Sequence, residues 1–142
     1  MQLSTKVRYG IRAMLEIALG EEGKPVMASY IAEKQFLSRK YLENLLNMLR
    51  VNGLVKSIRG SKGGYMLSRK PENITLEEIL IALDGPLAIT PCVGAPETCE
   101  YSKTCVTHEL WKDITDLISD YLKNKTLKDL VDSHLEKTSE NK

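Results

Sequence analysis

The 142-residue sequence is poor in aromatic residues, which make up 6% of the chain, and it contains no long apolar run. No apolar stretch approaches the roughly 20 residues that a membrane-spanning helix needs, so we expect no membrane partner. The first residues, MQLSTKVRYGIRAML, have neither a long apolar core nor a small-residue cleavage site, and they do not resemble a signal peptide. These absences favour a cytoplasmic protein.

The sequence also lacks the motifs of common enzyme classes. It contains no P-loop, no dinucleotide-binding glycine pattern and no pairing of a nucleophile with a base. Internal repeats and low-complexity segments are absent as well. We therefore expect neither an enzyme nor a protein with a small-molecule substrate.

Acidic residues are scarce in the first half of the chain and basic residues are scarce in the second, so the formal net charge of +1 hides two oppositely charged halves. Residues 1–70 carry 13 Lys/Arg and 5 Asp/Glu, whereas residues 71–142 carry 7 and 14. A basic first half and an acidic second half indicate that the first half meets a polyanion. The alternative is a solvated charged surface, which does not by itself segregate the signs.

Hydrophobic residues in the first third of the chain recur at helical spacing. They predict a helix that begins at Ser4 and ends at Gly20, a short helix over residues 28–34, and a longer helix from Ser38 to Asn52-Gly53. A short helix, a tight corner and a longer helix form the outline of a helix-turn-helix. This outline alone is weak, because any small helical bundle contains such pairs.

Two short strands are predicted next, over residues 55–59 and 65–69, joined by a turn with three glycines in five residues. A basic β-hairpin directly behind a helix-turn-helix makes a winged helix. The alternative is a packing element without a partner. A T-x-x-E capping box at Thr75 then begins a helix that stops at residue 84. We therefore predict a mainly α fold with a winged-helix DNA-binding domain over residues 1–84.

The second half of the chain predicts an irregular loop followed by a long helix. Residues 85–104 contain three prolines and two cysteines, and a helix resumes from Cys105. Its apolar positions alternate by four and three, which is typical of a helix–helix seam: Leu110, Ile114, Leu117 and Tyr121. We expect a dimerisation helix, although the stripe could pack on its own domain. The predicted division is a cluster-binding loop over 85–108, the dimerisation helix and a short last helix over 109–134, and a frayed tail over 135–142.

All three cysteines lie in the loop, in the pattern C-x6-C-x5-C-x2-H formed by Cys92, Cys99, Cys105 and His108. In a reducing cytosol, clustered cysteines more often bind metal than form disulfides, and an odd count leaves one cysteine over. Zinc would accept these ligands, but the paired C-x2–4-C spacing of structural zinc sites is absent. The longer gaps favour an iron–sulfur cluster, on which histidine can replace thiolate. The second histidine, His134, has no such neighbours and reads as a surface residue.

Two segments, YLENLLNMLRVNGLVKSIRGSKGGYMLSR and CVTHELWKDITDLISDYLKNKTLKDLV, resemble the iron–sulfur cluster assembly regulators of the IscR family. The resemblance covers roughly residues 1–132. It implies a homodimeric winged-helix transcription regulator with a [2Fe–2S] cluster on Cys92, Cys99, Cys105 and His108. The family's five-residue gap between the first two cysteines is six residues here, so a [4Fe–4S] cluster stays open as an alternative.

Several residues of the third helix lie off its apolar stripe and are candidates for DNA contact. Arg39 and Lys40 are placed for guanine edges or phosphates, and Asn44 for adenine. Glu43 has two interpretations: a surface residue paired with Arg39 or Lys40, or an acceptor for a cytosine amino group. The family match over YLE favours the second interpretation slightly.

In the predicted wing, Arg59 and Lys62 are candidates for phosphate or minor-groove contact, and Gly63 and Gly64 would let the backbone approach DNA closely. Two such modules related by a twofold axis predict a pseudo-palindromic double-stranded operator. The leading hypothesis is a dimeric DNA-binding regulator of cluster-assembly or related genes whose cluster state adjusts promoter binding. The alternatives are a small iron–sulfur electron-transfer protein and a zinc- or thiol-based redox-sensing regulator.

Overall fold

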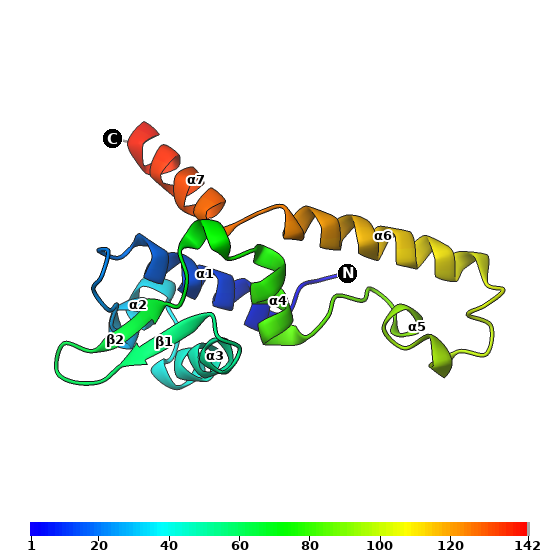
Figure 1. Ribbon diagram of the computed structural model, residues 1–142, viewed down its shortest axis with the longest axis horizontal. Helices are drawn as coiled ribbons and strands as arrows, with labels where there is room; N and C mark the ends of the chain where they lie inside the picture. The colour runs from blue at the N-terminus through cyan, green and yellow to red at the C-terminus, as the bar shows by residue number, and fades with distance from the viewer. Residues whose placement is uncertain (142) are drawn as a thin grey trace.

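The computed structural model describes residues 1–141 and is mainly helical, with one antiparallel hairpin (Figure 1). In chain order its elements are α1 (Thr5–Leu19), α2 (Ala28–Gln35), α3 (Arg39–Val51), β1 (Val55–Ile58), β2 (Gly64–Leu67), the 3-10 helix η1 (Pro71–Asn73), α4 (Leu76–Asp84), α5 (Pro91–Gly94), the 3-10 helix η2 (Pro96–Thr98), α6 (Val106–Lys123) and α7 (Leu127–Glu140). The predicted fold class, a winged helix-turn-helix followed by a long helix, is confirmed.

The predicted helix starts are confirmed by side-chain caps. The hydroxyl of Ser4 accepts a hydrogen bond from the Val7 N–H at 3.3 Å, and that of Ser38 accepts one from the Tyr41 N–H at 3.1 Å. Each bond satisfies one of the N–H groups that a helix leaves unpaired at its first turn. The capping therefore fixes where α1 and α3 begin.

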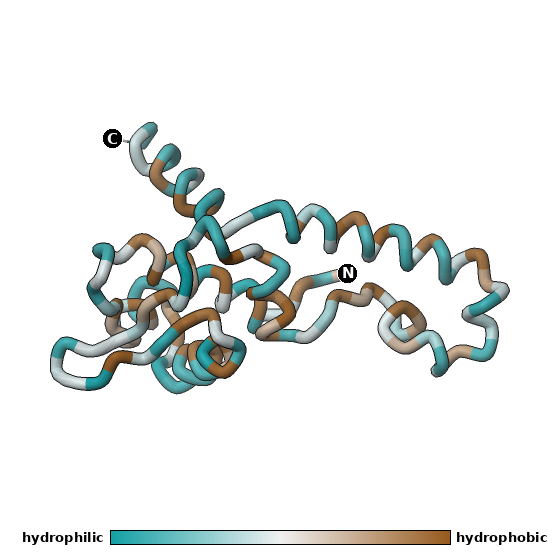
Figure 2. The backbone as a smooth tube through the Cα atoms, viewed as in Figure 1, coloured by the Kyte–Doolittle hydropathy of each residue, from teal (hydrophilic) through white to brown (hydrophobic). Residues whose placement is uncertain are grey.

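The core lies where α1, α3 and α4 meet, and it is built from the apolar faces of these helices (Figure 2). Its largest fully buried side chains come mostly from α1 to α4 and the segments between them, with Leu127 added from α7: Val7, Met14, Ile31, Leu42, Leu45, Leu46, Leu49, Leu54, Ile74, Ile79, Leu83 and Leu127. Helices α1 and α4 approach so closely at Gly10 that a β-carbon there would overlap the Leu83 side chain. Helix α4 is thereby pressed against α1.

The hairpin pairs β1 with β2 in register from Val55–Leu67 to Ile58–Gly64. The strands are slightly shorter than predicted, since Arg59, Ser68 and Arg69 fall outside them. The hairpin is also attached to the segment before α2, because Val26 and Tyr65 exchange two backbone hydrogen bonds at 2.9 and 2.8 Å. The wing and the helix-turn-helix are therefore one packed unit.

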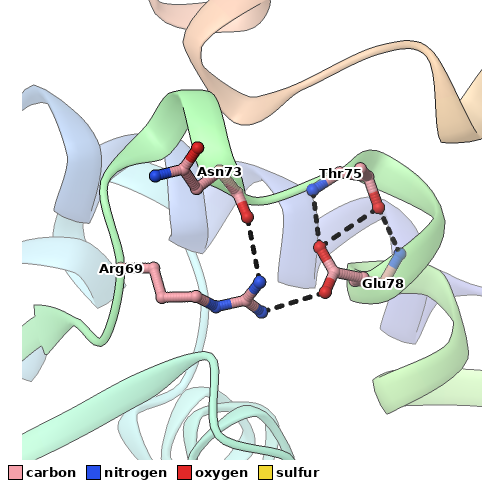
Figure 3. Close-up of polar contacts among 4 residues, drawn as sticks. All are labelled: Arg69, Asn73, Thr75 and Glu78. Atoms are coloured by element: carbon pink, nitrogen blue, oxygen red, sulfur yellow. Dashed lines mark hydrogen bonds and ion pairs between the residues drawn. The ribbon is translucent and has the colours of Figure 1, made fainter.

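An ion pair and a capping box join the end of the hairpin to α4 (Figure 3). The Arg69 guanidinium contacts a Glu78 carboxylate oxygen at 3.0 Å and donates to the Asn73 carbonyl at 2.9 Å. The other Glu78 oxygen accepts from the Thr75 N–H at 2.8 Å, and the Thr75 hydroxyl accepts from the Glu78 N–H at 3.2 Å. The predicted capping box is therefore present, with Arg69 as an additional partner.

The prediction of an irregular loop over residues 85–104 is partly wrong. The segment contains α5 and η2, which begin at Pro91 and Pro96. Proline is favoured at the first position of a helix because its missing N–H would be unpaired there and its φ is already helical. The two prolines that suggested a loop instead begin two short helical turns.

Helix α6 packs against α4 and α5, and in Figure 1 it extends away from the winged-helix unit toward α5. Helix α7 returns to pack against α1 and η1, with Leu127 and Val131 buried. The prediction of a frayed tail over 135–142 is wrong for residues 135–140, which continue α7; Lys142 lies outside the described residues. A capping box at Thr126 begins this helix, and the polar tail continues it as an exposed face.

Candidate nucleic-acid interface and metal centre

The outer face of α3 carries the residues predicted to contact DNA. Arg39, Lys40, Glu43 and Asn44 are all exposed, while Leu42, Leu45, Leu46 and Leu49 on the other side are buried. The apolar side therefore anchors the helix and the polar side is free. The amphipathic pattern read from the sequence correctly separated the two.

Glu43 has a partner within the helix, because its carboxylate contacts the Arg39 guanidinium at 3.1 Å. Both side chains are largely exposed, and an exposed i,i+4 pair contributes only about 0.3–0.5 kcal/mol. A contact with a base or phosphate can outweigh this amount. The pair agrees with the first interpretation of Glu43, and its contact with cytosine stays a prediction.

The cations Lys40, Arg59 and Lys62 are exposed, and no ion pair within residues 1–141 involves them. Arg59 and Lys62 flank the tip of the hairpin, which lies with α3 at the lower side of the molecule in Figure 1. Arg69, which is close in sequence, is instead bound to Glu78. Lys40 on α3 and Arg59 and Lys62 at the wing tip are therefore free of ion pairs within the described residues.

The two wing glycines have a structural role that the sequence did not reveal. A β-carbon on Gly63 would overlap the Ile58 carbonyl, and one on Gly64 would overlap the backbone at Val26. Gly64 also has φ +154°, which residues with side chains rarely adopt. A side chain at either position would therefore force the hairpin backbone to shift, and the approach of the two glycines to DNA stays a prediction.

The three cysteines and the histidine lie on successive short elements at the far end of the molecule. Cys92 is in α5, Cys99 follows η2, Cys105 is the N-cap of α6, and His108 is in its first turn. All three thiols are free and partly exposed. The structure does not bring the four side chains together: within residues 1–141, no three His, Cys, Asp or Glu side chains form a group that could hold one metal ion.

The donor atoms nevertheless have the chemistry that an iron–sulfur cluster requires. The Nδ1 atom of His108 is buried and has no hydrogen-bond partner, although buried polar atoms are nearly always paired. It stands on the same helical turn as the Cys105 thiol, and three free thiolates with an imidazole can ligate such a cluster. The residues present therefore fit the group in their chemistry.

Two threonine hydroxyls lie beside the sulfurs, and sequence analysis did not identify them. Thr90 Oγ1 is 3.1 Å from Cys92 Sγ, and Thr107 Oγ1 is 3.0 Å from Cys105 Sγ. The Thr107 hydroxyl lowers the pKa of the Cys105 thiol, and backbone hydrogen bonding at His108 lowers it further. A hydroxyl two residues from a cysteine at a helix start is the sequence signal that could have revealed them.

The apolar stripe of α6 is largely uncovered. The exposed fractions are 49% for Leu110, 71% for Leu117 and 62% for Tyr121, while Ile114 is half-buried. The other side of the helix contacts α4, where Ser119 donates a hydrogen bond to Glu77. In Figure 2 apolar positions recur along the helix between polar ones. The rest of the single chain therefore leaves most of the stripe uncovered.

Residues 3–133 match the model of the Rrf2 family, described as iron-dependent transcriptional regulators. The chain belongs to the Rrf2 family. It is 42% identical over 133 residues to the HTH-type transcriptional regulator IscR of Pectobacterium atrosepticum, covering 94% of this chain and 80% of that protein. It is 41% identical to IscR of Escherichia coli O1:K1 / APEC, covering 94% and 82%.

Solved structures of Rrf2 proteins have the same fold. The cysteine regulator CymR of B. subtilis superposes with a TM-score of 0.78 at 39% identity, covering 94% of this chain and 98% of that one. IscR of T. potens also gives 0.78, at 36% identity, covering 94% and 88%. The chain is thus an Rrf2 transcriptional regulator, and its relatives are named as regulators rather than enzymes. Within the described residues, no helix has the length and apolar character needed to cross a bilayer.

Proposed function

We propose that this Rrf2 protein acts as a homodimer that binds a pseudo-palindromic operator and adjusts its affinity to the state of an iron–sulfur cluster. The cluster, of the [2Fe–2S] type, is held by Cys92, Cys99, Cys105 and His108. The observation that carries the proposal is the buried, unpaired Nδ1 atom of His108, in a segment that also contains three free thiols. The family description as iron-dependent regulators supports the same conclusion.

DNA binding depends on the exposed cations of α3 and the wing. Lys40, Arg59 and Lys62 are available for phosphates because they have no acidic partner among residues 1–141. Each phosphate contact releases counterions, so the plot of log K against log salt has a slope of about −0.9 per contact. Replacing one of these residues by alanine should make this slope shallower by about one. Lys137→Ala on α7 is the control that should leave it unchanged.

The homodimer forms through the exposed stripe of α6. A twofold interface presents the same patch from both copies, and Leu110, Leu117 and Tyr121 supply an apolar patch. A groove of about 780 Å³ adjoins the same helix and is lined in part by Leu80, Ile89, Trp111 and Ile118. Side chains of a second α6 can enter it.

When bound, the cluster supplies a redox-active and oxidation-sensitive group at the start of α6. The ligand residues span 92–108, and closing on one group would order α5, η2 and the first turn of α6 relative to one another. Helix α6 contacts α4 through Ser119 and Glu77, and α4 packs on α1 and α3. Ordering of the loop therefore biases the placement of α6 against the DNA-reading unit, and with it the separation of two recognition helices.

The test is an anaerobic purification followed by visible spectroscopy, iron and sulfide analysis, and an electrophoretic shift assay on operator DNA. The wild type is expected to be coloured, to contain iron and sulfide, and to shift DNA. His108→Ala should lose iron and change operator affinity. His134→Ala is the matched control, because His134 is exposed on α7 and should leave both unchanged.

Three results would contradict different parts of the proposal. Iron-free, colourless protein after anaerobic reconstitution rules out the cluster and favours a zinc- or thiol-based regulator. Iron-loaded protein that shifts no duplex at low salt rules out DNA reading and favours an electron-transfer protein. A triple Cys92, Cys99 and Cys105→Ala variant with unchanged binding at every operator rules out cluster control alone.

A further inference from the structure

The turn between α2 and α3 has an unusual backbone for the residue it contains. Phe36 has φ 54° and ψ 42°, the left-handed conformation. The Leu37 N–H bonds to the Ala32 carbonyl at 2.9 Å and the Phe36 N–H to Glu33 at 3.3 Å, which is the glycine type of helix C-cap. Glycine or asparagine would adopt this conformation at lower cost than phenylalanine.

The phenyl ring of Phe36 is not packed in the single chain. The side chain of Phe36 is 94% exposed, whereas Leu37 beside it packs against the core. Within residues 1–141, Phe36 is the one non-glycine residue with positive φ, and it is the chain's single phenylalanine. A strained and solvated aromatic residue at a defined place indicates that a partner contacts it.

The neighbours of Phe36 along the chain indicate the kind of partner. Phe36 is two residues before Ser38, the N-cap of α3, so their α-carbons are at most about 7.6 Å apart. Its exposed charged neighbours along the chain are cations except for Glu33: Lys34, Arg39 and Lys40. In helix-turn-helix proteins the N-terminal residues of the recognition helix contact base edges in the major groove. The ring is therefore carried at the edge of the DNA-facing surface.

We propose that Phe36 is a specificity-determining residue that contacts the 5-methyl group of one thymine in each operator half-site. The methyl group is the apolar feature that the major groove offers, and apolar side chains including phenylalanine recognise it. Phe36 lies in sequence between Lys34 and Arg39, and this basic segment fits a polyanion that carries such a group better than it fits an apolar protein surface. The proposal rests on the DNA-reading function proposed above.

The experiment begins with duplexes that the full-length wild-type protein selects from a random pool. Each thymine of the selected duplex is then replaced, one at a time, by deoxyuridine, which lacks only the methyl group. For the wild type, one substitution per half-site should weaken binding by about threefold to fivefold, as expected for one buried methyl group. Phe36→Gly removes the contact from both half-sites, so the unmodified duplex should bind this variant about 9- to 25-fold more weakly than it binds the wild type, and deoxyuridine should have no further effect.

Stability measurements separate this effect from misfolding. Phe36→Gly and Phe36→Asn remove the left-handed strain, so both variants should have a higher Tm than the wild type while binding the selected duplex less tightly. Leu135→Ala, which truncates another exposed apolar side chain, should leave the deoxyuridine profile unchanged.

Each outcome decides a separate question. If the wild type and Phe36→Gly give the same deoxyuridine profile, the inference is overturned while DNA reading stands. If Phe36→Gly instead changes the sedimentation of the DNA-free protein and leaves the profile unchanged, the ring contacts protein and the inference is again overturned. If the wild type selects no duplex, the DNA-reading function itself fails.

Discussion

Leu117→Ala should weaken the proposed homodimer strongly, and the size of the effect follows from the exposure of the side chain. The substitution removes three carbons, each worth about 0.8 kcal/mol when buried. Since 71% of Leu117 is exposed in the single chain, burial in the interface stabilises by about 1.7 kcal/mol per protomer for those carbons. A twofold interface contains two copies, so the dimer loses about 3.4 kcal/mol. The dimer dissociation constant should therefore rise roughly 200- to 300-fold.

Sedimentation equilibrium over a wide range of protein concentrations measures this constant. Alanine favours helix, so the substitution does not weaken α6 itself. Leu135→Ala is the matched control, because it makes the same chemical change at an exposed leucine of α7 and should leave the constant unchanged. Equal dimerisation of wild type and Leu117→Ala would refute the assignment of the α6 stripe to the interface.

Three further predictions concern single positions. Gly64→Ala should lower the free energy of unfolding in urea by about 1–3 kcal/mol more than Gly23→Ala, because both glycines have positive φ but only Gly64 meets backbone; equal losses would contradict this. Desolvation raises the pKa of Glu78, but its hydrogen bonds and ion pair outweigh it and hold the pKa below the ordinary 4.5. The ionised Glu78 carboxylate stabilises the folded state above pH 4.5, and this stabilisation is lost as pH falls through the lowered pKa. The difference in Tm between the wild type and Glu78→Gln should therefore shrink from pH 7 to about pH 3. Thr107→Val removes a hydroxyl beside the sulfur of Cys105, a proposed ligand, and should lower the reduction potential of the proposed cluster at unchanged iron content. Thr104→Val, whose hydroxyl bonds a carbonyl instead, should leave the potential unchanged.

The fold was predictable because local signals and the hydrophobic pattern agree over residues 1–84. Ser4, Ser38 and Thr75 each stand before an apolar period, and each is an N-cap in the structure. The errors occurred where one residue type allows two local structures. Proline suggested loop over 85–104 although it also begins helices, and the polar end of the chain hid the continuation of α7 to Glu140.

The candidate site was predictable in its donor types and not in its three-dimensional arrangement. Spacing can place Cys105 and His108 on one helical turn, but it cannot specify how Cys92 in α5 and Cys99 just after η2 would meet them. Contacts that join distant segments also could not be predicted from the sequence. Neither the clash of a Gly64 β-carbon with the backbone at Val26 nor the Ser119–Glu77 hydrogen bond leaves a pattern in the sequence.

The two backbone hydrogen bonds between Val26 and Tyr65 limit which parts of this protein can move relative to one another. In the proposed dimer they would make each half a rigid unit, in which the hairpin does not move independently of the helix-turn-helix. The distance between the two rigid units of the proposed dimer is then what can vary. In addition to reading the bases of each half-site, such a dimer would tell apart promoters that differ in the number of base pairs between half-sites.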